Sequence, residues 1–379
     1  MGNQNSGEYV KVLFCGRGAF DDAVNQTKKL LKDSEFADKM LVKTCNPESV
    51  IDEISTAHIV IPLMCKITRD LIVKAPFLAL INQFGVGVEG IDIKAASECG
   101  IAVANIPSEG TGNAESCAEL AIYLIIACLR NQKEMENSIK SKHLGFPTGR
   151  TILGANIFIY GMGGIGRQVA ARIRAFQPAR LVGISKSGNT SELVDEMGGP
   201  ADVPRLAKGS HIVVICVNLD NTTKGIVNKD FIDLLSRGAI IVNVARGGIL
   251  NYSDVLDALH CNQLSAVGLD VFHTEPIPPD DPLVQHPRCI VTPHIAGVTH
   301  VSYHILASYL VDNIDRLLKG DKLRNVVNER LLNEGTGEMS TSIASPSPSS
   351  TRVATDVVLT PSPSQSSPSP SPSLGIGSP

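Results

Sequence analysis

Short runs of apolar residues alternate with longer amphipathic stretches through most of the chain. In the first hundred residues, such runs followed by turn residues predict strands at Val10–Phe14, His58–Pro62, Ala79–Gln83 and Ile101–Asn105. The alternation restarts at residue 157 and predicts six more strands: Ile157–Tyr160, Leu181–Ser185, Ile212–Val217, Ile240–Val244, Val267–Asp270 and Ile290–Val291. Short apolar strands separated by helical stretches are typical of parallel sheets with crossover helices. The pattern therefore predicts an α/β fold.

Two longer helices stand out from this alternation. Asn113 is the predicted N-cap of a helix over Ala114–Arg130, with Glu115 adding a favourable charge to its first turn. This helix is apolar around much of its circumference, which predicts burial between domains or in a subunit interface. A second helix, predicted over Val301–Leu318, is expected to return to the first domain.

Composition narrows the class of protein. The 379 residues suffice for about two domains, 43% of them are hydrophobic, and the net charge is −4. That charge, the absence of Trp and 4% aromatics argue against a nucleic-acid partner. The nine cysteines are scattered and form no CxxC pair, which favours reduced thiols in an intracellular, cytoplasmic protein over disulfides or a metal site. The longest apolar run, Leu120–Leu129, is too short to span a bilayer.

The two ends of the chain carry possible modification signals. No secretory leader is visible, but the first six residues fit the pattern for N-myristoylation at Gly2, with a chance match as the alternative. After Asn333 the composition becomes rich in Ser and Pro, which predicts a disordered tail over 334–379. Its Ser-Pro dipeptides are either phosphorylation sites or part of an inert solvated segment.

The most informative motif is a glycine-rich loop in the middle of the chain. The strand ending at Tyr160 is followed by glycines at the spacing GxGxxG and then by a helix. In this context Gly161 allows a tight turn, Gly163 lets a pyrophosphate approach, and Gly166 lets the helix pack closely on the strand. The loop therefore predicts a dinucleotide site.

The next predicted strand indicates which dinucleotide. An NAD site places a carboxylate about 20 residues after the glycines, where it binds the ribose. The chain instead has Ser185 and Lys186 at that strand end, and no carboxylate. A lysine and hydroxyls would favour a 2′-phosphate, so NADP(H) is predicted over NAD(H). The alternative is a solvated Lys186, with Ser185 bonding an unphosphorylated ribose.

Three polar residues follow later strands of the same predicted sheet. Arg246, Glu275 and His294 stand where an open α/β sheet places its ligand crevice. An arginine fork can hold the carboxylate and carbonyl of a 2-oxo acid, and a histidine can transfer the hydroxyl proton near neutral pH. A neighbouring glutamate can orient the imidazole and raise its pKa.

These motifs together resemble one family. GMGGIG, NVARGGIL, GLDVFHTEP and TPHIAG, in this order, are similar to motifs of the D-isomer-specific 2-hydroxyacid dehydrogenases, as is the earlier run GVGVEGID. The resemblance implies that Arg246 binds the substrate, His294 is the general acid and base, and Glu275 is its partner. It implies that Asp270 contacts the nicotinamide carboxamide side of the cofactor. It also implies pyrophosphate contacts by Gly163, Gly164 and Ile165, and substrate contacts by the backbone N–H groups near Val86, Gly87 and Val88.

The resemblance also implies an architecture. Two Rossmann-like or flavodoxin-like parallel-sheet domains are expected, with a nucleotide-binding domain over 114–298 inserted into a discontinuous substrate domain, 1–113 plus 299–330. Relatives of this kind are usually homodimers. The chain departs from the pattern at Gly164, where many members have a larger residue, and at Phe84, which is bulkier than the usual small residue.

The activity implied is hydride transfer between NAD(P)(H) and a D-2-hydroxy or 2-oxo acid. The narrower expectation is a glyoxylate or hydroxypyruvate reductase. Formate dehydrogenases of the family have Gln in place of Glu275, so that activity is not expected. The alternatives are a phosphoglycerate dehydrogenase-like activity and a cofactor-sensing scaffold or co-repressor of the same fold.

Overall fold

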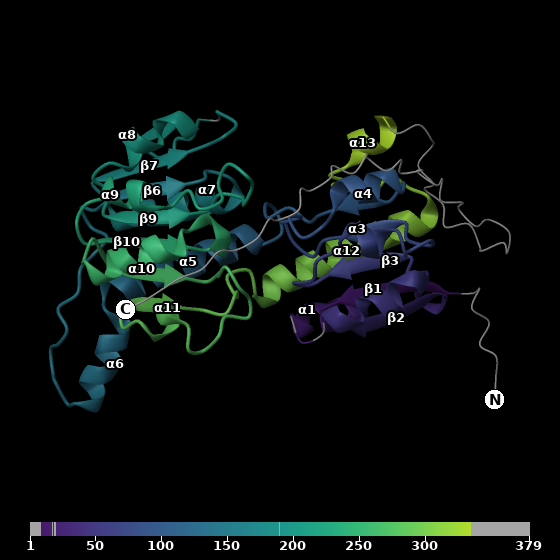
Figure 1. Cartoon of the computed structure of the whole chain (residues 1–379), viewed down its shortest axis with the longest axis horizontal. Helices are drawn as coiled ribbons and strands as arrows, with labels where there is room; N and C mark the ends of the chain where they lie inside the picture. Colours follow the sequence, from purple (N-terminus) through teal and green to yellow (C-terminus); the bar gives the residue numbers. More distant parts are fainter. Residues whose placement is uncertain (1–8, 17, 19, 189, 335–379) are drawn as a thin grey trace, which may run out of the picture. The chain divides into compact units, whose positions relative to one another are not determined.

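The computed structural model describes residues 9–334 except positions 17, 19 and 189, and it contains two parallel sheets (Figure 1). This confirms the predicted parallel α/β class. The possible acylation at Gly2 and the Ser/Pro-rich tail lie outside the described residues. Among the described residues, none of the helices combines the length and the hydrophobicity needed to cross a membrane.

The first sheet has five strands in the order β2-β1-β3-β4-β5. These are β1 (Val10–Cys15), β2 (Met40–Cys45), β3 (Ile59–Pro62), β4 (Leu80–Asn82) and β5 (Ala102–Ala104). One face packs against α1 (Asp21–Leu31), α12 (His300–Lys319) and α13 (Glu329–Glu334), and the other against α2 (Val50–Glu53), α3 (Arg69–Ile72) and α4 (Ile93–Glu98). Because successive strand residues face opposite sides, Phe14 reaches the first face and Cys15 the second.

The second sheet has seven strands in the order β12-β11-β10-β9-β6-β7-β8. These are β6 (Asn156–Tyr160), β7 (Arg180–Ile184), β8 (Glu196–Gly198), β9 (Ile212–Ile215), β10 (Ala239–Asn243), β11 (Leu264–Leu269) and β12 (Cys289–Val291). One face is covered by α5 (Asn113–Leu129) and α7 (Gly164–Ile173), and the other by α8 (Val203–Ala207), α9 (Lys229–Asp233), α10 (Tyr252–His260) and α11 (Pro282–Gln285). The remaining helix, α6 (Gln132–Lys140), follows α5. Strand order reverses beside β6, which places a ligand crevice at the carboxyl ends of β6 and β9.

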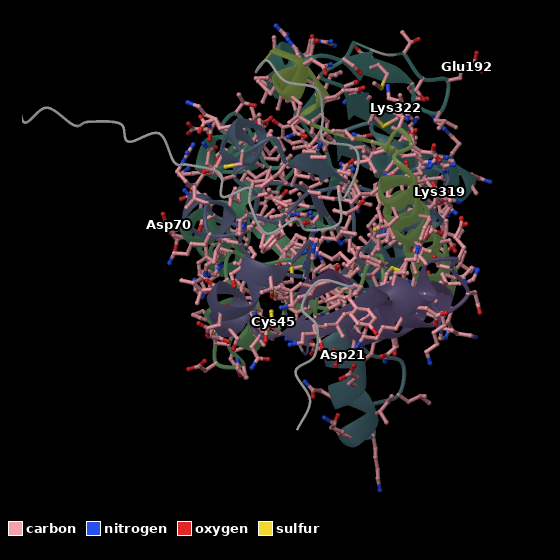
Figure 2. All side chains as sticks on the ribbon, turned by 90° about the vertical axis from the view of Figure 1, so that its right-hand side faces the viewer. Asp21, Cys45, Asp70, Glu192, Lys319 and Lys322 are labelled. Carbon is pink, nitrogen blue, oxygen red and sulfur yellow. The ribbon has the colours of Figure 1, made fainter. Side chains whose placement is uncertain are left out.

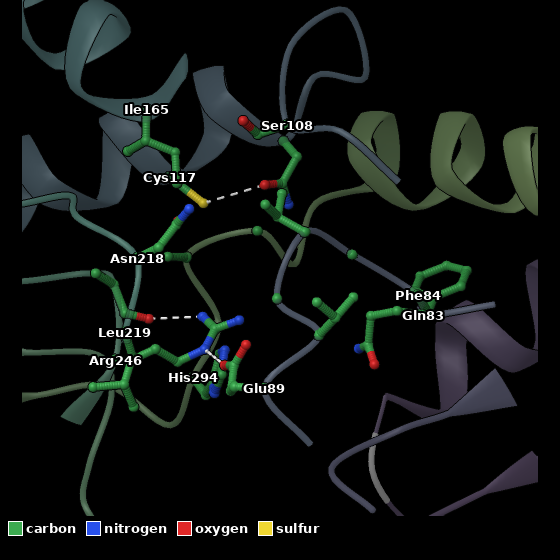
Figure 3. A pocket seen from close by; sticks show the side chains of 18 of the residues that line it. Gln83, Phe84, Glu89, Ser108, Cys117, Ile165, Asn218, Leu219, Arg246 and His294 are labelled. Atoms are coloured by element: carbon green, nitrogen blue, oxygen red, sulfur yellow. Dashed lines mark hydrogen bonds and ion pairs between the residues drawn. The ribbon is translucent and has the colours of Figure 1, made fainter. Parts of the chain in front are cut away.

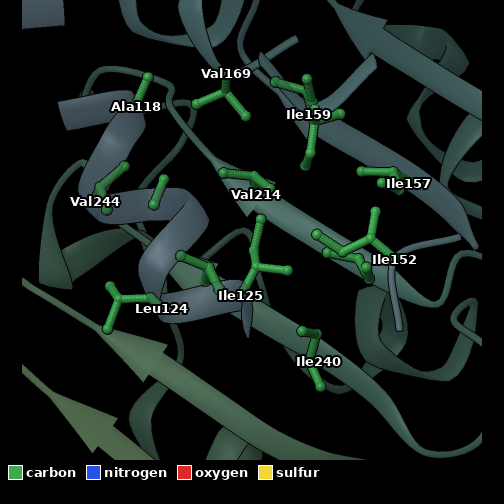
Figure 4. Packing of buried hydrophobic residues seen from close by; sticks show 14 of the residues in the cluster. Ala118, Leu124, Ile125, Ile152, Ile157, Ile159, Val169, Val214, Ile240 and Val244 are labelled. Atoms are coloured by element: carbon green, nitrogen blue, oxygen red, sulfur yellow. The ribbon is translucent and has the colours of Figure 1, made fainter. Parts of the chain in front are cut away.

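The core beneath α5 explains why that helix is apolar on most sides. Leu124 and Ile125 are fully buried against Ile157, Val214 and Ile240 of the sheet (Figure 4). At Gly268 of β11, an added Cβ would lie 2.9 Å from the Cβ of Leu124, so a side chain there would push the helix off the sheet. Each buried aliphatic side chain of this kind contributes about 1.5–3 kcal/mol to stability.

Two strands were not predicted. β2 includes Lys43 and Thr44 and is exposed at several positions, and β8 has only three half-buried residues. Both lie at sheet edges, where one side of the strand has no partner in the sheet and continuous hydrophobicity is not required. The sheets therefore have five and seven strands, where four and six were predicted.

The start of α5 also differs from the prediction. Gly112, with φ of 71°, is the N-cap, and Asn113 is already helical. The Asn113 side chain instead donates to the hydroxyl of Ser302 in α12, and the Ser116 hydroxyl lies 2.9 Å from that of Thr299, the N-cap of α12. These contacts join the first turns of α5 and α12, the two places where the predicted substrate domain passes to the nucleotide domain. Those domain boundaries stay a prediction.

Candidate active site

A cavity of about 780 Å³ lies among loops that follow strands of both sheets (Figure 3). Its lining includes the loop after β4, the glycine loop after β6, and the loops after β9, β10 and β12. Besides the backbone segment 86–88, six of the predicted functional positions belong to this lining: Gly163, Gly164, Ile165, Arg246, Asp270 and His294. Glu275 is not part of the lining but contacts a residue that is.

His294 and Glu275 form a hydrogen-bonded pair. The imidazole Nδ1 lies 2.6 Å from Oε2 of Glu275, and the other carboxylate oxygen accepts from the backbone N–H of Phe272 at 2.8 Å. Burial opposes ionisation of Glu275, but the contacts with His294 and Phe272 and the charge of Arg246 hold its pKa below the usual value. The carboxylate is therefore anionic at neutral pH and orients the ring, leaving Nε2 as the nitrogen available to a ligand.

The loop that carries His294 is held by Asp270. His294 has φ of 54°, a left-handed conformation that costs roughly 1–2 kcal/mol for a residue with a side chain. The fully buried Asp270 carboxylate accepts from the backbone N–H groups of Ile295 and Ala296, both at 2.8 Å, and from the Thr292 hydroxyl at 2.7 Å. Its backbone carbonyl accepts from the His294 N–H at 2.8 Å. Asp270 thus has a structural task in addition to its predicted cofactor contact.

Replacing Glu275 with glutamine is expected to lower the free energy of unfolding by about 1 kcal/mol at neutral pH, because the amide keeps the shape but loses the charge-assisted bond. A carboxyl whose pKa is depressed on folding stabilises the protein above its unfolded-state pKa. That contribution is lost as the pH falls through the lower folded-state pKa. Denaturant unfolding at several pH values measures the difference, which should be full at pH 7 and vanish in acid. A difference independent of pH would contradict the charged pair.

Arg246 is positioned by a hydrogen-bonded loop after β10. The buried Asn243 side chain accepts from the N–H of Ala245 at 3.0 Å and donates to the carbonyl of Arg246 at 2.9 Å. An added Cβ at Gly247 would overlap the backbone of Phe272, so this loop packs directly on the one that carries Glu275. Asn243 was not among the predicted site residues, because its one signal in the sequence is a polar residue at the end of an apolar strand.

The Arg246 guanidinium faces Glu89 of the loop after β4 (Figure 3). Nε donates to the Glu89 carboxylate, and Nη1 donates to the carbonyl of Ala245 at 2.7 Å. Gly87 leaves the space that these two side chains occupy. Within the described residues, the backbone N–H groups of Val86, Gly87 and Val88 donate no hydrogen bond, so they remain available to an anion. Glu89 lies inside the motif GVGVEGID, but no local pattern assigned it a role.

The glycine loop has the geometry that a phosphate site needs. Gly161 has φ of 108°, and an added Cβ would lie 2.7 Å from the backbone of Cys216. A Cβ at Gly166 would overlap the carbonyl oxygen of Gly161, whereas one at Gly163 would meet nothing within 4 Å. The open side at Gly163 lies at the N-terminus of α7, where backbone N–H groups favour an anion. A Cβ at Gly164 would lie 2.6 Å from the Ser108 hydroxyl, so a larger residue there would require the Ser108 side chain to move.

Ser185 and Lys186 follow β7 but do not belong to the cavity lining. The Ser185 hydroxyl bonds that of Ser187 at 2.9 Å, and the Lys186 ammonium lies 3.2 Å from the carboxylate of Asp220. Asp220 does line the cavity. Hydrogen bonds from Thr222 and the bond from Lys186 hold its pKa well below the usual range. The charge of Lys186 is therefore offset by a carboxylate that sequence analysis did not connect with it.

Among residues 9–334 that the structure describes, no cluster of three or more His, Cys, Asp or Glu side chains is arranged to hold a metal ion.

Comparison with known proteins gives concordant matches. Residues 122–296 match the family model described as D-isomer specific 2-hydroxyacid dehydrogenase, NAD binding domain. A hydroxypyruvate reductase of Blautia hydrogenotrophica is 32% identical over 291 residues, which cover 74% of this chain and 88% of the relative. A D-3-phosphoglycerate dehydrogenase of Methanocaldococcus jannaschii is 33% identical over 286 residues, which cover 74% of this chain and 53% of the relative.

The solved structures include an NAD-dependent formate dehydrogenase of Staphylococcus aureus in complex with NAD. It has a TM-score of 0.71 at 25% identity and covers 83% of this chain and 98% of its own. The chain spans only about half the length of three of the curated phosphoglycerate dehydrogenases that it matches, between 51% and 58%.

Proposed function

We propose that this chain, which belongs to the D-isomer-specific 2-hydroxyacid dehydrogenase family, is an NAD(P)-dependent oxidoreductase. Its reaction interconverts a D-2-hydroxy acid and a 2-oxo acid. The observation that carries the proposal is the His294–Glu275 pair at 2.6 Å, with His294 and Arg246 both lining one cavity. This combination supplies a proton-transfer group and a carboxylate-binding group at one site.

The proposed mechanism uses these residues as follows. Arg246 and the free backbone N–H groups of the 86–88 segment bind the substrate carboxylate. In the reductive direction, Nε2 of His294 donates a proton to the carbonyl oxygen, and Glu275 on Nδ1 stabilises the ring while it is charged. A bound nicotinamide cofactor would supply or accept the hydride. The open side of the loop at Gly163 and the N-terminus of α7 would hold its pyrophosphate.

We propose glyoxylate or hydroxypyruvate as the oxo-acid substrate. Among the described residues that line the cavity, Arg246 is the single lysine or arginine, while Glu89, Asp92, Asp220 and Asp270 are acidic. A phosphorylated substrate needs cationic or N–H partners for its phosphate as well as for its carboxylate. The high coverage of the hydroxypyruvate reductase also supports the smaller substrate.

The test is a spectrophotometric screen of glyoxylate, hydroxypyruvate, 3-phosphohydroxypyruvate and pyruvate, each with NADH and NADPH. The first two are expected to give the highest kcat/KM. A preference for 3-phosphohydroxypyruvate would replace the narrower proposal with a phosphoglycerate dehydrogenase-like activity. Absence of turnover with every acid, together with intact cofactor binding, would favour a cofactor-sensing scaffold.

We propose a preference for NADP(H), supported by Lys186 and Ser185 at the end of β7. Replacing Asp220 with asparagine is expected to raise the NADPH/NADH ratio of kcat/KM, because Lys186 loses its competing carboxylate. Replacing Lys186 with alanine should lower the ratio by about tenfold, the effect of losing one charged hydrogen bond. Lys229→Ala, which breaks the exposed pair with Asp233, is the matched control. An unchanged ratio in both test variants would overturn the proposal.

We propose that Glu89 competes with the substrate carboxylate for Arg246. Glu89→Gln is expected to lower KM for the oxo acid by about two- to fivefold, the amount that a part-exposed ion pair allows. Glu98→Gln, which removes a carboxylate from the pair with Arg69, is the control. If kcat falls while KM stays constant, Glu89 orients the arginine rather than competing for it.

We further propose a cytoplasmic homodimer with the inserted-domain architecture. Buried cysteines such as Cys15, Cys128 and Cys289 are free thiols, which supports a reducing compartment. Large apolar side chains are exposed on α5 and beyond it, including Tyr123, Ile126, Ile139 and Leu144, which is 99% exposed. Such side chains typically mark a protein interface. Sedimentation of the wild type and of Leu144→Glu tests this, with a shift toward monomer expected in the variant.

A further inference from the structure

Three cysteines lie at or just beyond the carboxyl ends of three neighbouring strands in the first sheet. Cys15 is the last residue of β1, Cys45 is the last residue of β2, and Cys65 follows β3 by three residues. Because β1 lies between β2 and β3, Cys15 is the central thiol of the three. None of them lines the cavity described above.

Cys15 and Cys45 face each other across the parallel ladder. They are direct register partners, so their side chains project from the same face of the sheet. Both belong to the apolar cluster that contains Val50 and Ile54. Neighbouring strands lie about 4.8 Å apart, inside the Cα separation of about 4.4–6.8 Å that a disulfide spans. The two thiols therefore need no rearrangement of the strands to reach each other.

The two thiols differ in exposure and in chemistry. Cys15 is fully buried, whereas Cys45, labelled in Figure 2, keeps 7% of its surface exposed. The interaction between the two thiols lowers the pKa of Cys45 and, together with burial, raises that of Cys15. Cys45 is thus the more readily ionised and the more accessible partner, and the thiolate is the form that reacts with oxidants.

A buried cation supports this assignment. Lys11, on the same strand as Cys15, is 6% exposed and bonds Glu53 at 2.5 Å and the Thr56 hydroxyl at 2.8 Å. Its charge lowers the pKa of both thiols, while Glu53 opposes it at Cys45. Cys65 is half-buried, and burial is the main cause that raises its pKa to about 11. Its thiol is therefore less reactive than that of Cys45.

We propose that Cys45 and Cys15 form a redox-sensitive dithiol that a hydroperoxide converts to a disulfide. The Cys45 thiolate attacks the peroxide, so that an S–O bond forms as the O–O bond breaks, giving a sulfenic acid and, for hydrogen peroxide, water. Cys15 then attacks the Cys45 sulfur, so that the S–S bond forms and the oxygen leaves with a proton as a second water. Two thiols are oxidised and one peroxide is reduced.

Two cysteines outside this group, Cys289 and Cys261, are arranged differently. Cys289 of β12 is paired in register with Val267, and burial raises the pKa of its thiol to about 12. Cys261, the C-cap of α10, is exposed and donates to the carbonyl of Ala258. Cys261 therefore offers a matched control for simple accessibility.

The test treats the reduced full-length chain with hydrogen peroxide, alkylates the remaining thiols and maps the peptides by mass spectrometry. A Cys15–Cys45 linked peptide is expected, lighter by two hydrogens than the sum of its parts and reversed by a dithiol reductant. Cys15→Ser should trap a sulfenic acid at Cys45 that a dimedone-type probe labels, and Cys45→Ser should abolish both products. Cys261→Ser should leave the linked peptide unchanged.

Two results would overturn the proposal. One is a wild-type chain in which Cys261 or Cys65 is oxidised while Cys15 and Cys45 remain fully alkylated. The other is a bridge from Cys45 to Cys65 in place of Cys15. The peptide mapping of the wild-type chain uses no variant. The test therefore remains decisive even if the Cys15→Ser chain does not fold. Because the assay follows thiols and not turnover, its outcome is also independent of the proposed dehydrogenase activity.

Discussion

Replacing His294 with alanine is expected to lower kcat by about 100- to 10,000-fold, the range that a positioned general acid or base contributes. The Nδ1 atom is bonded to Glu275 at 2.6 Å, so Nε2 is the nitrogen proposed to meet the substrate oxygen. Removing the ring leaves no group in this position to donate the proton. The measurement is the steady-state oxidation of the reduced cofactor with the best oxo acid from the screen.

Two controls separate loss of chemistry from loss of structure. His304→Ala removes an exposed histidine from α12 and should leave kcat unchanged. Cofactor affinity should also survive in His294→Ala, and the chain has no Trp whose emission overlaps with excitation of the reduced nicotinamide. Wild-type turnover in the alanine variant would contradict the assignment of His294 as the proton-transfer group.

Replacing Arg246 with alanine is expected to lower kcat/KM by about 100- to 1,000-fold, because the proposed charge pair with the substrate carboxylate is lost, and truncating one partner of such a pair costs about 2–5 kcal/mol. Asn243 holds the Arg246 loop through the backbone, so the loop should keep its conformation in the variant. The proposed dinucleotide site at Gly163 lies on a different loop, after β6, so the Kd of the cofactor should be nearly unchanged. Steady-state kinetics and cofactor titration measure the two quantities in one preparation.

A lysine variant separates the charge of Arg246 from its planar shape. Arg246→Lys keeps the charge but loses the planar fork, so an intermediate kcat/KM is expected. The alanine variant also frees Glu89, which lies beside the segment whose N–H groups are proposed to bind the substrate carboxylate. Combining Arg246→Ala with Glu89→Gln should therefore recover part of the loss. Equal damage to substrate and cofactor binding would indicate a misfolded cavity and would contradict the proposed role.

Local patterns were sufficient for much of the fold. The buried strands of both sheets read as continuous apolar runs because helices cover both of their faces, and their predicted positions agree with the structure within a few residues. The edge strands β2 and β8 were missed because β2 is exposed at several positions and β8 is only half-buried, so neither forms a continuous apolar run. Asn113 was misassigned as a cap because an asparagine before an apolar run suits an N-cap, whereas its side chain is used to contact Ser302.

The candidate site was also predicted only in part from the sequence. Motifs identified Arg246, Glu275 and His294, because residues at the carboxyl ends of parallel strands converge in such folds. The partners of two of the proposed ligand-binding residues were missed. Glu89 lies 157 residues from Arg246, and Asp220 lies 34 residues from Lys186, so no local pattern connects either pair.

By itself, the sequence determined which segments become buried strands, where the backbone must turn tightly without a side chain, and which side chains can transfer a proton or bind a carboxylate. These properties depend on residue type and near neighbours. The tertiary structure alone decided which charges meet: Glu89 at Arg246, Asp220 at Lys186, and the thiol of Cys45 at that of Cys15. Such contacts arise from strand order and loop packing, because electrostatic and hydrogen-bond energies depend on distances in space and not on separation along the chain.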